Sequence, residues 1–349
     1  MSGVSQGHRS VKELVDRYAR QRLLPFLGEE GQKRLEQSAI LVVGCGATGS
    51  HIASLAARVG VGRIVLVDRD IVELHNLPRQ VLFEEEDVLR ERPKALALRD
   101  RIRSINSSVE VEAYVGEFHP GNGEELCRGV QLIFDGTDNF QTRFLINELG
   151  LKLRLPWVYM GVISTVGHVM PILPFKGPCL RCYLSEEPRA GELETCDTVG
   201  VWAGAVSLVS AIGFTEGVRI LLGDSPSFRG LFTFDIWSFQ WRVLGLKRDR
   251  ECLNCGRGEY RYLGPRGSWA EVERVCGENV VCVRLGVFSY LELMERLKRC
   301  GEVKEGEYFF KFRSEEGREF TIFSDGRVLV FGTQDFQKAR SWCARYIGL

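Results

Sequence analysis

The 349-residue chain lacks an excess of charge of either sign, because its 46 basic residues balance its 46 acidic ones. Proteins that bind nucleic acid or an anionic membrane usually carry a basic excess, so the composition argues against both kinds of partner. We also expect no apolar run long enough to span a bilayer. Residues 1–17 are polar and charged and lack the apolar core of a signal peptide. These absences predict a cytoplasmic protein.

Cysteine is plentiful for such a protein, with 11 residues. Cytoplasmic thiols rarely form a disulfide framework, so ligands, reactive thiols and core residues are the expected roles. Four of them form two CxxC pairs: Cys179, Cys182, Cys252 and Cys255. Four thiolates complete a tetrahedral zinc site that is closed to substrate. A redox-active CxxC is the alternative, but two copies favour a structural zinc that ties two distant segments together.

The most informative stretch covers residues 38–79. A short, β-branched apolar run, Ala39–Val43, predicts a buried strand. An amphipathic helix, a second apolar run and Asp68 follow. The turn between strand and helix contains a GxGxxG pattern, made by Gly44, Gly46 and Gly49. A lone GxGxxG also fits a tight turn without a ligand. Here the helix N-terminus can bind phosphate and the carboxylate can accept ribose hydroxyls, so nucleotide binding is favoured.

Strands alternate with helices as far as residue 160, which predicts an α/β fold with a Rossmann-like, doubly wound and mainly parallel sheet. Short strands and turns after Met160 predict an antiparallel extension. The composition shifts near residue 262, and the tail has the pattern of a compact α+β domain. Its cysteines at 276, 282, 300 and 343 are expected in the core. The expected parts are a helical segment (1–37), a nucleotide-binding domain with the CxxC pairs (38–262) and a small α+β domain (263–349).

Ligands of such sheets bind beyond the carboxyl ends of the strands. Asp68, the loop 76–79 and Asp138 all follow predicted strands. A proline before Lys94 predicts that a new helix begins there, and a cation in the first turn of a helix favours an anion in front of it. Two acids beside Lys94 and Arg79 suit a magnesium-bound nucleoside triphosphate. Asp138 also fits a helix N-cap, a role compatible with metal binding.

Together these motifs resemble those of the MoeB/ThiF/HesA group, bacterial relatives of ubiquitin-activating enzymes, over about residues 12–262. The matching stretches are RYARQ, GCGATG, VDRD, NLPRQ, RPKA, DGTDN, TRFLIN, ETCDTVGV and the paired CxxC. The resemblance implies a homodimer that uses ATP and Mg²⁺ to adenylate the C-terminal glycine of a small ubiquitin-like sulfur carrier. Pyrophosphate would be released. The carrier would be ThiS-like or MoaD-like, for thiamine or molybdopterin sulfur transfer.

The resemblance also implies roles for individual residues. Asp68 would hold the ribose, Asp138 the magnesium, and Arg20 would reach the site of the neighbouring subunit. Cys196 matches a cysteine that bonds covalently to the activated carrier in ThiF-like members; a partly buried free thiol is the alternative. The loop 185–194 would cross over the carrier's tail. The implied nucleotide-binding residues are Gly44, Gly46, Gly49, Asp68, Asp70, Asn76, Arg79, Lys94, Asp138 and Asn139, and the implied Zn²⁺ ligands are Cys179, Cys182, Cys252 and Cys255.

The sequence departs from the family pattern in a few places. Ala47 stands where many members have glycine and Pro78 where many have glutamine, and neither change removes a polar contact on which the prediction depends. The tail lacks the cysteine-containing loop of a rhodanese domain, so we do not expect it to carry persulfide sulfur. We expect it to be a docking or dimer-supporting module instead.

Two other interpretations stay open at this point. An NAD-dependent oxidoreductase would use the same glycine pattern, but it would not explain Lys94, Arg79 and the CxxC pairs together. None of the five histidines is evidently placed for hydride transfer. A non-catalytic scaffold of the same fold is disfavoured because the charged residues Asp68, Arg79, Lys94 and Asp138 are intact. We expect an adenylyltransferase.

Overall fold

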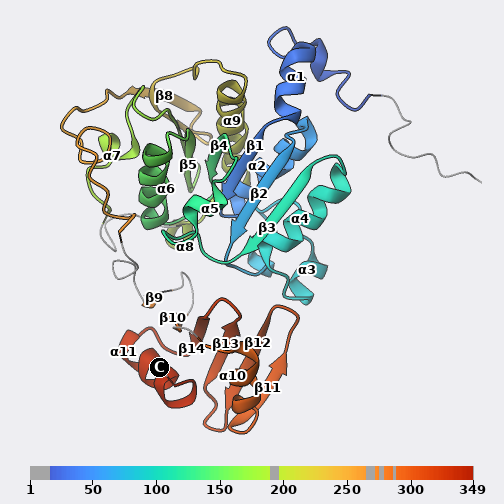
Figure 1. Cartoon of the computed structure of the whole chain (residues 1–349), viewed down its shortest axis with the longest axis vertical. Coiled ribbons are helices and arrows are strands. Elements are labelled where there is room, and N and C mark those ends of the chain that lie inside the picture. Colours follow the sequence, from blue (N-terminus) through green and yellow to red (C-terminus); the bar gives the residue numbers. More distant parts are fainter. Residues whose placement is uncertain (1–15, 189–195, 265–271, 275–278, 286–287, 349) are drawn as a thin grey trace, which may run out of the picture.

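The computed structural model describes residues 16–188, 196–264, 272–274, 279–285 and 288–348, without the side chains of residues 196, 197 and 272–274. Two sheets organise these residues (Figure 1). The larger sheet has eight strands in the order β3-β2-β1-β4-β5-β6-β7-β8. Its strands are β1 (Ala39–Val43), β2 (Arg63–Asp68), β3 (Glu110–Val115), β4 (Leu132–Asp135), β5 (Trp157–Ile163), β6 (Val166–Ile172), β7 (Gly230–Asp235) and β8 (Gln240–Gly245).

The neighbouring strands β3, β2, β1, β4 and β5 of the larger sheet run parallel to one another. Strands β6, β7 and β8 continue the sheet from β5, and each runs antiparallel to the strand before it. This arrangement confirms the predicted parallel sheet with an antiparallel extension. Val43 at the end of β1 lies opposite both Val67 of β2 and Asp135 of β4. The segments that follow these three strands therefore begin at one edge of the sheet, where doubly wound folds bind their ligands.

Alternate residues of the buried strands serve two cores, one on each face of the sheet. Ile40 and Val42 pack with α2, α4 and α9, whereas Leu41 and Val43 pack with α6 and α7. The helices are α1 (Gly28–Glu36), α2 (Ala47–Val59), α3 (Glu85–Leu89), α4 (Lys94–Ile105), α5 (Gly123–Leu126), α6 (Phe140–Leu153), α7 (Leu180–Tyr183), α8 (Cys196–Val199) and α9 (Ala203–Leu221), with the 3-10 turns η2 (Gln21–Leu23) and η3 (Leu74–Asn76).

Helix α9 corrects one expectation from the sequence. By length and composition it is apolar enough to cross a membrane, although no such run was expected. In the structure it packs against β5, β6 and α2, and its residues Val206 and Val209 are fully buried. Its position in the core accounts for its apolar composition.

The smaller sheet has six antiparallel strands and its own core of apolar residues. Its elements are β9 (Val272–Arg274), β10 (Val280–Arg284), α10 (Tyr290–Leu297), β11 (Gly301–Glu305), β12 (Phe309–Ser314), β13 (Glu319–Phe323), β14 (Arg327–Phe331) and α11 (Phe336–Tyr346). Strands β9 and β11 could not be predicted from the sequence. The sequence of β11, GEVKE, has a single large apolar residue, so only its pairing with β12 identifies it as a strand.

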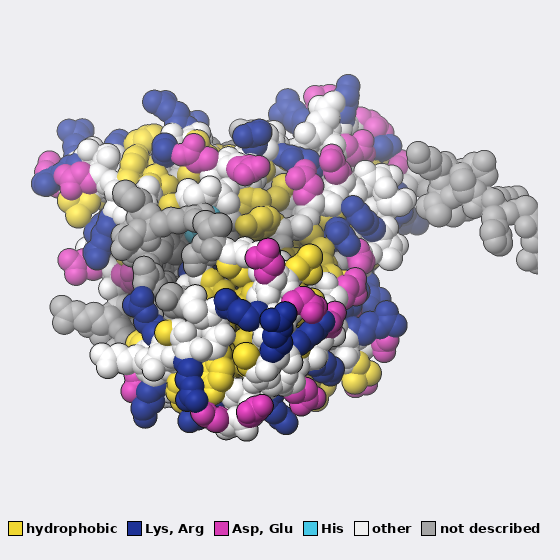
Figure 2. All heavy atoms as spheres, turned by 60° about the horizontal axis from the view of Figure 1, so that its bottom comes forward, with side chains coloured by type: hydrophobic (Ala, Val, Ile, Leu, Met, Phe, Trp, Pro, Cys, Tyr) yellow, Lys and Arg dark blue, Asp and Glu magenta, His cyan; other side chains and the backbone are white. Residues whose placement is uncertain are grey.

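The cysteines of this small domain were expected in its core. Cys282 and Cys343 are buried, but Cys300 is exposed just after α10, which corrects that prediction. Cys276 lies outside the described residues. Figure 1 shows the small domain on the side of the large sheet where α3 lies. Figure 2 views the molecule from the small-domain end, where basic and acidic side chains are interspersed with apolar ones.

Candidate active site

The glycine turn between β1 and α2 packs tightly against the loop that follows β4. Gly44 has a φ of 85°, and a Cβ on it would lie 2.7 Å from the carbonyl group of Gly136. A Cβ on Gly49 would overlap the carbonyl oxygen of Gly44. Gly46 is different, because the atom nearest to a Cβ there would be Nε2 of Gln80, at 3.8 Å. The protein leaves space in front of Gly46, as expected where a backbone approaches a phosphate or ribose.

Asp68 fastens the glycine turn to the end of β2. Its Oδ2 accepts a hydrogen bond from the backbone N–H of Cys45 at 2.6 Å, and its Oδ1 accepts one from Asp70 at 2.7 Å. Burial and the charge of Asp70 raise the pKa of Asp68, against the effect of Lys94 and the two N–H donors. Each carboxylate oxygen has a further lone pair for a ribose hydroxyl.

Helix α4 begins at Lys94, directly after Pro93, as the sequence predicts. The Lys94 side chain is buried, and its Nζ lies 3.2 Å from Oδ2 of Asp70. Its backbone N–H also donates to the carbonyl oxygen of Asp70, at 2.9 Å. Burial by itself lowers the pKa of Lys94, but the carboxylates of Asp70 and Asp68 outweigh it and raise this pKa above its ordinary value. The structure therefore holds a permanently charged ammonium group near the glycine turn.

The loop after β4 places Asp138 without using it as a helix cap. Asn139 is the N-cap of α6, and its Oδ1 accepts a hydrogen bond from the backbone N–H of Thr142 at 2.8 Å. The alternative role considered for Asp138 thus belongs to its neighbour. Asp138 is exposed, and its carboxylate raises the pKa of both Lys94 and Arg143. These charges converge from three separate loops.

Arg143 and Asp135 hold this loop in place, and the sequence analysis did not single them out. Asp135 is fully buried, and its Oδ2 accepts a hydrogen bond from Nε of Arg143 at 3.0 Å. Nη2 of Arg143 donates to the carbonyl oxygens of Thr137 at 2.7 Å and Met160 at 3.1 Å. Both residues lie within motifs quoted above, DGTDN and TRFLIN, but only the structure shows that they pair.

The loop after β2 contains the predicted residues Asn76 and Arg79 and a further polar residue, Gln80, which was not predicted to belong to the site. Asn76 is buried and uses its Oδ1 to accept from the backbone N–H of Glu73, so it shapes the loop. Arg79 is half-buried, and its Nη1 donates to the carbonyl oxygen of His75 at 2.6 Å. Gln80 is buried beside Gly46, and its Oε1 has no hydrogen-bond partner among the described residues. An orphaned buried oxygen beside an open glycine fits a missing polar ligand.

The four CxxC cysteines come together as predicted. Their Sγ atoms all lie within 4.8 Å of one another, with the Sγ atoms of Cys179 and Cys252 3.6 Å apart and those of Cys182 and Cys255 3.4 Å apart. Zn–S bonds of about 2.3 Å in a tetrahedron place the sulfur atoms about 3.8 Å apart. The donor set and its spacing fit one metal ion of this kind.

Helix α6 carries two polar residues that join the cysteine pairs, and these were also missed. Asn147 accepts from the backbone N–H of Leu180 at 2.9 Å and donates to Asn254 at 3.1 Å, so it links the two CxxC turns. Glu148 accepts from the backbone N–H groups of the segment after the second turn, between Arg261 and Leu263. The middle of the helix that follows the DGTDN loop therefore supports the cysteine cluster.

Two predicted site residues are not brought to this edge of the sheet. Arg20 is exposed just before η2, in a segment whose Tyr18 accepts a hydrogen bond from Asn106 at 2.9 Å. Asn106 precedes β3, so this segment lies at the amino edge, opposite Asp68. Cys196 begins α8, but its side chain is outside the described residues, as are residues 189–194 of the predicted crossover loop.

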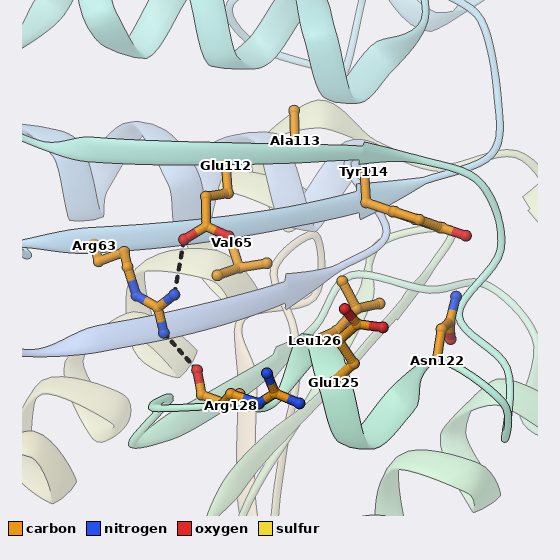
Figure 3. A pocket seen from close by; sticks show the side chains of 9 residues that line it. All are labelled: Arg63, Val65, Glu112, Ala113, Tyr114, Asn122, Glu125, Leu126 and Arg128. Atoms are coloured by element: carbon orange, nitrogen blue, oxygen red, sulfur yellow. Dashed lines mark hydrogen bonds and ion pairs between the residues drawn. The ribbon is translucent and has the colours of Figure 1, made fainter.

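A separate cavity of about 390 Å³ lies beside β2, β3 and α5 (Figure 3). Its basic residue Arg63 already binds Glu112 at 2.7 Å and the carbonyl oxygen of Arg128 at 2.6 Å. None of the predicted nucleotide-binding residues lines it. This cavity is therefore distinct from the site at the carboxyl edge.

Residues 18–254 match the model of the ThiF family. The chain belongs to this family. The match covers well over half of the chain and confirms the resemblance inferred from the motifs. This ThiF-family protein is also 35% identical over 344 residues to the sulfur carrier protein ThiS adenylyltransferase of Bacillus subtilis, covering 96% of this chain and 100% of that protein.

A second relative aligns with a smaller share of the chain. The ThiF-family protein is 36% identical over 254 residues to the sulfur carrier protein adenylyltransferase of Thermus thermophilus, covering 71% of this chain and 93% of that protein. The Bacillus alignment thus extends into the small domain, and the Thermus alignment does not require it. Among solved structures, Escherichia coli MccB with ATP matches with a TM-score of 0.59 and 20% identity, covering 69% of this chain and 74% of MccB. That likeness confirms the fold.

Proposed function

We propose that this ThiF-family protein is an ATP-dependent adenylyltransferase that activates the C-terminal glycine of a small ubiquitin-like sulfur carrier. The observation that carries the proposal is the convergence of the open turn at Gly46 with Asp68, Lys94 and Asp138 at one edge of the sheet. The adenylating unit would be residues 38–262. Relatives named for this activity support the reaction and the carrier class.

The reaction needs no nucleophile from the protein. A carboxylate oxygen of the carrier's terminal glycine attacks the α-phosphorus of ATP, the bond to the bridging oxygen of the β-phosphate breaks, and pyrophosphate leaves with the electron pair. Catalysis then rests on in-line positioning and on neutralising the phosphate charge. Asp68 would hold the ribose, while Lys94 and Arg79 would bind the phosphates.

Two metal ions complete the proposal. Asp138 is an exposed carboxylate of the site and would hold Mg²⁺, which neutralises phosphate charge when bound. The four-cysteine cluster would hold a structural Zn²⁺ that joins the segments around Cys179 and Cys252. With four thiolate ligands this zinc would have no position open to substrate.

The surface supports protein partners. Strand β8 is the last strand of the large sheet, and all its residues are exposed. Exposed large apolar side chains gather on β8 and the turn before it: Trp237, Phe239, Trp241, Val243 and Leu244. Such a patch is typical of a protein contact. It suits the carrier and a homodimer in which Arg20 would act in the neighbouring subunit's site. We place the protein in the cytoplasm.

The test is carrier-dependent ATP–pyrophosphate exchange with ThiS-like and MoaD-like carriers offered separately. We expect exchange with at least one carrier, abolished by Asp138→Ala and retained by Asp224→Ala, which removes an exposed carboxylate just after α9. Exchange with one carrier names the pathway, and exchange with both identifies a shared activator. NAD binding without exchange would favour the oxidoreductase, and neither activity would favour the scaffold.

A further inference from the structure

The small C-terminal domain contacts three loops of the large domain, and each loop adjoins the candidate nucleotide site. Arg327 of β14 binds the backbone at Arg69, directly after Asp68. Arg284 of β10 pairs with Glu117, in the loop after β3. The third contact joins Lys311 of β12 to Glu91, three residues before Lys94. The contacts therefore gather at the carboxyl edge of the large sheet.

Arg327 is held rigidly within its own domain. Its side chain is 3% exposed, and its Nε donates to Oδ2 of Asp325 at 2.6 Å. Its Cζ lies 4.3 Å from the centre of the Phe323 ring. Nη1 then donates across the domain boundary to the carbonyl oxygen of Arg69, at 2.5 Å. A guanidinium fixed by an acid and a ring gives that hydrogen bond a set direction.

The backbone that Arg327 contacts is the turn that carries the predicted ribose and phosphate contacts. Arg69 lies between Asp68, which fastens the glycine turn, and Asp70, which pairs with Lys94. Desolvation by the surrounding protein would raise the pKa of Asp70, but Lys94, Arg69 and Arg327 outweigh it and lower this pKa to about 2. The charge on the small domain thus acts on the same carboxylate that holds Lys94.

The remaining charges fix how the two domains dock. Arg284 lies opposite Arg327 in the β10–β14 ladder, and like charges in that position repel. Burial, Arg69 and Arg327 lower the pKa of Arg284 to about 10. Glu117 supplies the opposing charge, because it is buried, pairs with Arg284 and also accepts from Arg69 at 3.0 Å. Removing one member would leave a buried charge unpaired, so this arrangement disfavours other docking geometries.

We propose that the small domain is an intramolecular support for nucleotide binding, and that Arg327 is a positioning residue that holds the turn of Asp68 and Asp70 through the carbonyl group of Arg69. This inference rests on the proposed ATP-binding function of the site. It assigns the tail to the ATP step of the reaction. It does not require the tail to contact the carrier.

The experiment compares full-length wild-type protein, Arg327→Gln and Arg345→Gln in carrier-dependent ATP–pyrophosphate exchange. Arg345 is the control, because it is exposed on α11 and pairs with Glu316 inside the small domain. We expect Arg327→Gln to raise the KM for ATP about 10-fold, the size of one hydrogen bond to a charged group. The kcat and the KM for the carrier should stay within about twofold. Equal KM values for ATP in all three proteins would overturn the proposal.

A second variant covers the case in which Arg327→Gln fails to fold. Lys311 and Glu91 are both partly exposed, so Lys311→Glu weakens docking without disturbing a core. It should raise the KM for ATP about 2-fold to 3-fold, as expected for an exposed ion pair. Adding Glu91→Lys to the Lys311→Glu variant reverses both charges of the pair and should restore the wild-type KM. A KM unchanged by Lys311→Glu in that case contradicts the proposal.

Backbone hydrogen exchange separates this inference from the proposed function. Amide protons of residues 69–72 should exchange faster in Arg327→Gln, or in Lys311→Glu, than in wild type without any nucleotide. Faster exchange with no adenylation in wild type would leave the support standing and reject the adenylyltransferase. Unchanged amide exchange together with normal adenylation would reject the support alone.

Discussion

Lys94 and Asp70 form an ion pair at the start of α4, with Nζ 3.2 Å from Oδ2 and a second link from the Lys94 N–H to the Asp70 carbonyl oxygen. The Lys94 ammonium is buried while the Asp70 side chain is 54% exposed. The ion pair keeps the Lys94 ammonium charged and in place at the start of α4. The pair prepares the site for an anion without leaving the cation unbalanced.

We predict that Lys94→Met lowers ATP–pyrophosphate exchange by about 100-fold or more, because a preorganised cation facing developing charge has effects of that size. Lys94→Arg should retain part of the activity, since the charge remains. Lys33→Met on the exposed face of α1 is the matched control and should be neutral. Full activity of Lys94→Met would remove Lys94 from the proposed mechanism.

The glycines of the turn should divide into two classes. Gly49→Ala would place a methyl group on the carbonyl oxygen of Gly44, so we expect it to lower stability by several kcal/mol, about the cost of overpacking or more. In Gly46→Ala the atom nearest to the new methyl group would be Nε2 of Gln80, at 3.8 Å, which is an ordinary van der Waals contact. It should cost less stability and mainly weaken ATP binding.

Urea unfolding and calorimetric ATP titration measure the two effects of these alanine substitutions. We expect Gly49→Ala to be the less stable of the two variants in urea. We expect Gly46→Ala to be folded and to bind ATP poorly. Wild-type ATP affinity in Gly46→Ala would show that the space in front of Gly46 does not receive the nucleotide.

The cysteine cluster predicts one tightly bound zinc per chain. Cys179→Ser should lose most of this zinc and lower the Tm by roughly 5–10 °C, because metal binding contributes directly to the folding free energy. Metal analysis and thermal unfolding measure both quantities. Cys300→Ser is the control, because that thiol is exposed and outside the cluster. Equal zinc content in the two variants would contradict the assignment.

Half-buried His168 predicts a stability that depends on pH. Burial and the charge of Arg143 lower the pKa of His168 below its ordinary value of 6.5. As the pH falls below about 6.5, the unfolded chain binds a proton at this residue before the folded protein does. The His168 contribution to stability is therefore fully present above that pH and declines below it, by at most about 1.4 kcal/mol per pH unit.

Urea unfolding at pH 7.5 and 5.5 tests this prediction. The loss of stability between the two values should be smaller in His168→Asn than in wild type. His75→Asn is the control, because the His75 side chain is 64% exposed and should leave the difference unchanged. His51 also has a pKa lowered by burial, so part of the decline should persist in both variants. An unaltered decline in His168→Asn would show that His168 does not titrate this way.

Much of the site could be predicted from the sequence because its signals are local. The glycine pattern, the acid at the end of β2 and the start of α4 at Lys94 each depend on a few neighbouring residues. The two CxxC pairs also predicted that their four cysteines lie together, since two such pairs are typical of the ligands of one zinc ion. The alternative role of Asp138 as a helix N-cap was wrong by one residue, because the N-cap of α6 is Asn139.

The sequence by itself determined the sheet type, the edge at which we propose nucleotide binding and the cysteine cluster. Their causes are periodicity and short-range backbone geometry, which can be read within about 20 residues. Only the tertiary structure decided which residues pair across long separations. Glu148 meets the segment after Asn254, and Arg327 meets Arg69, because separate elements pack together. No local pattern specifies which buried polar groups satisfy one another, so these supports appear only in the folded chain.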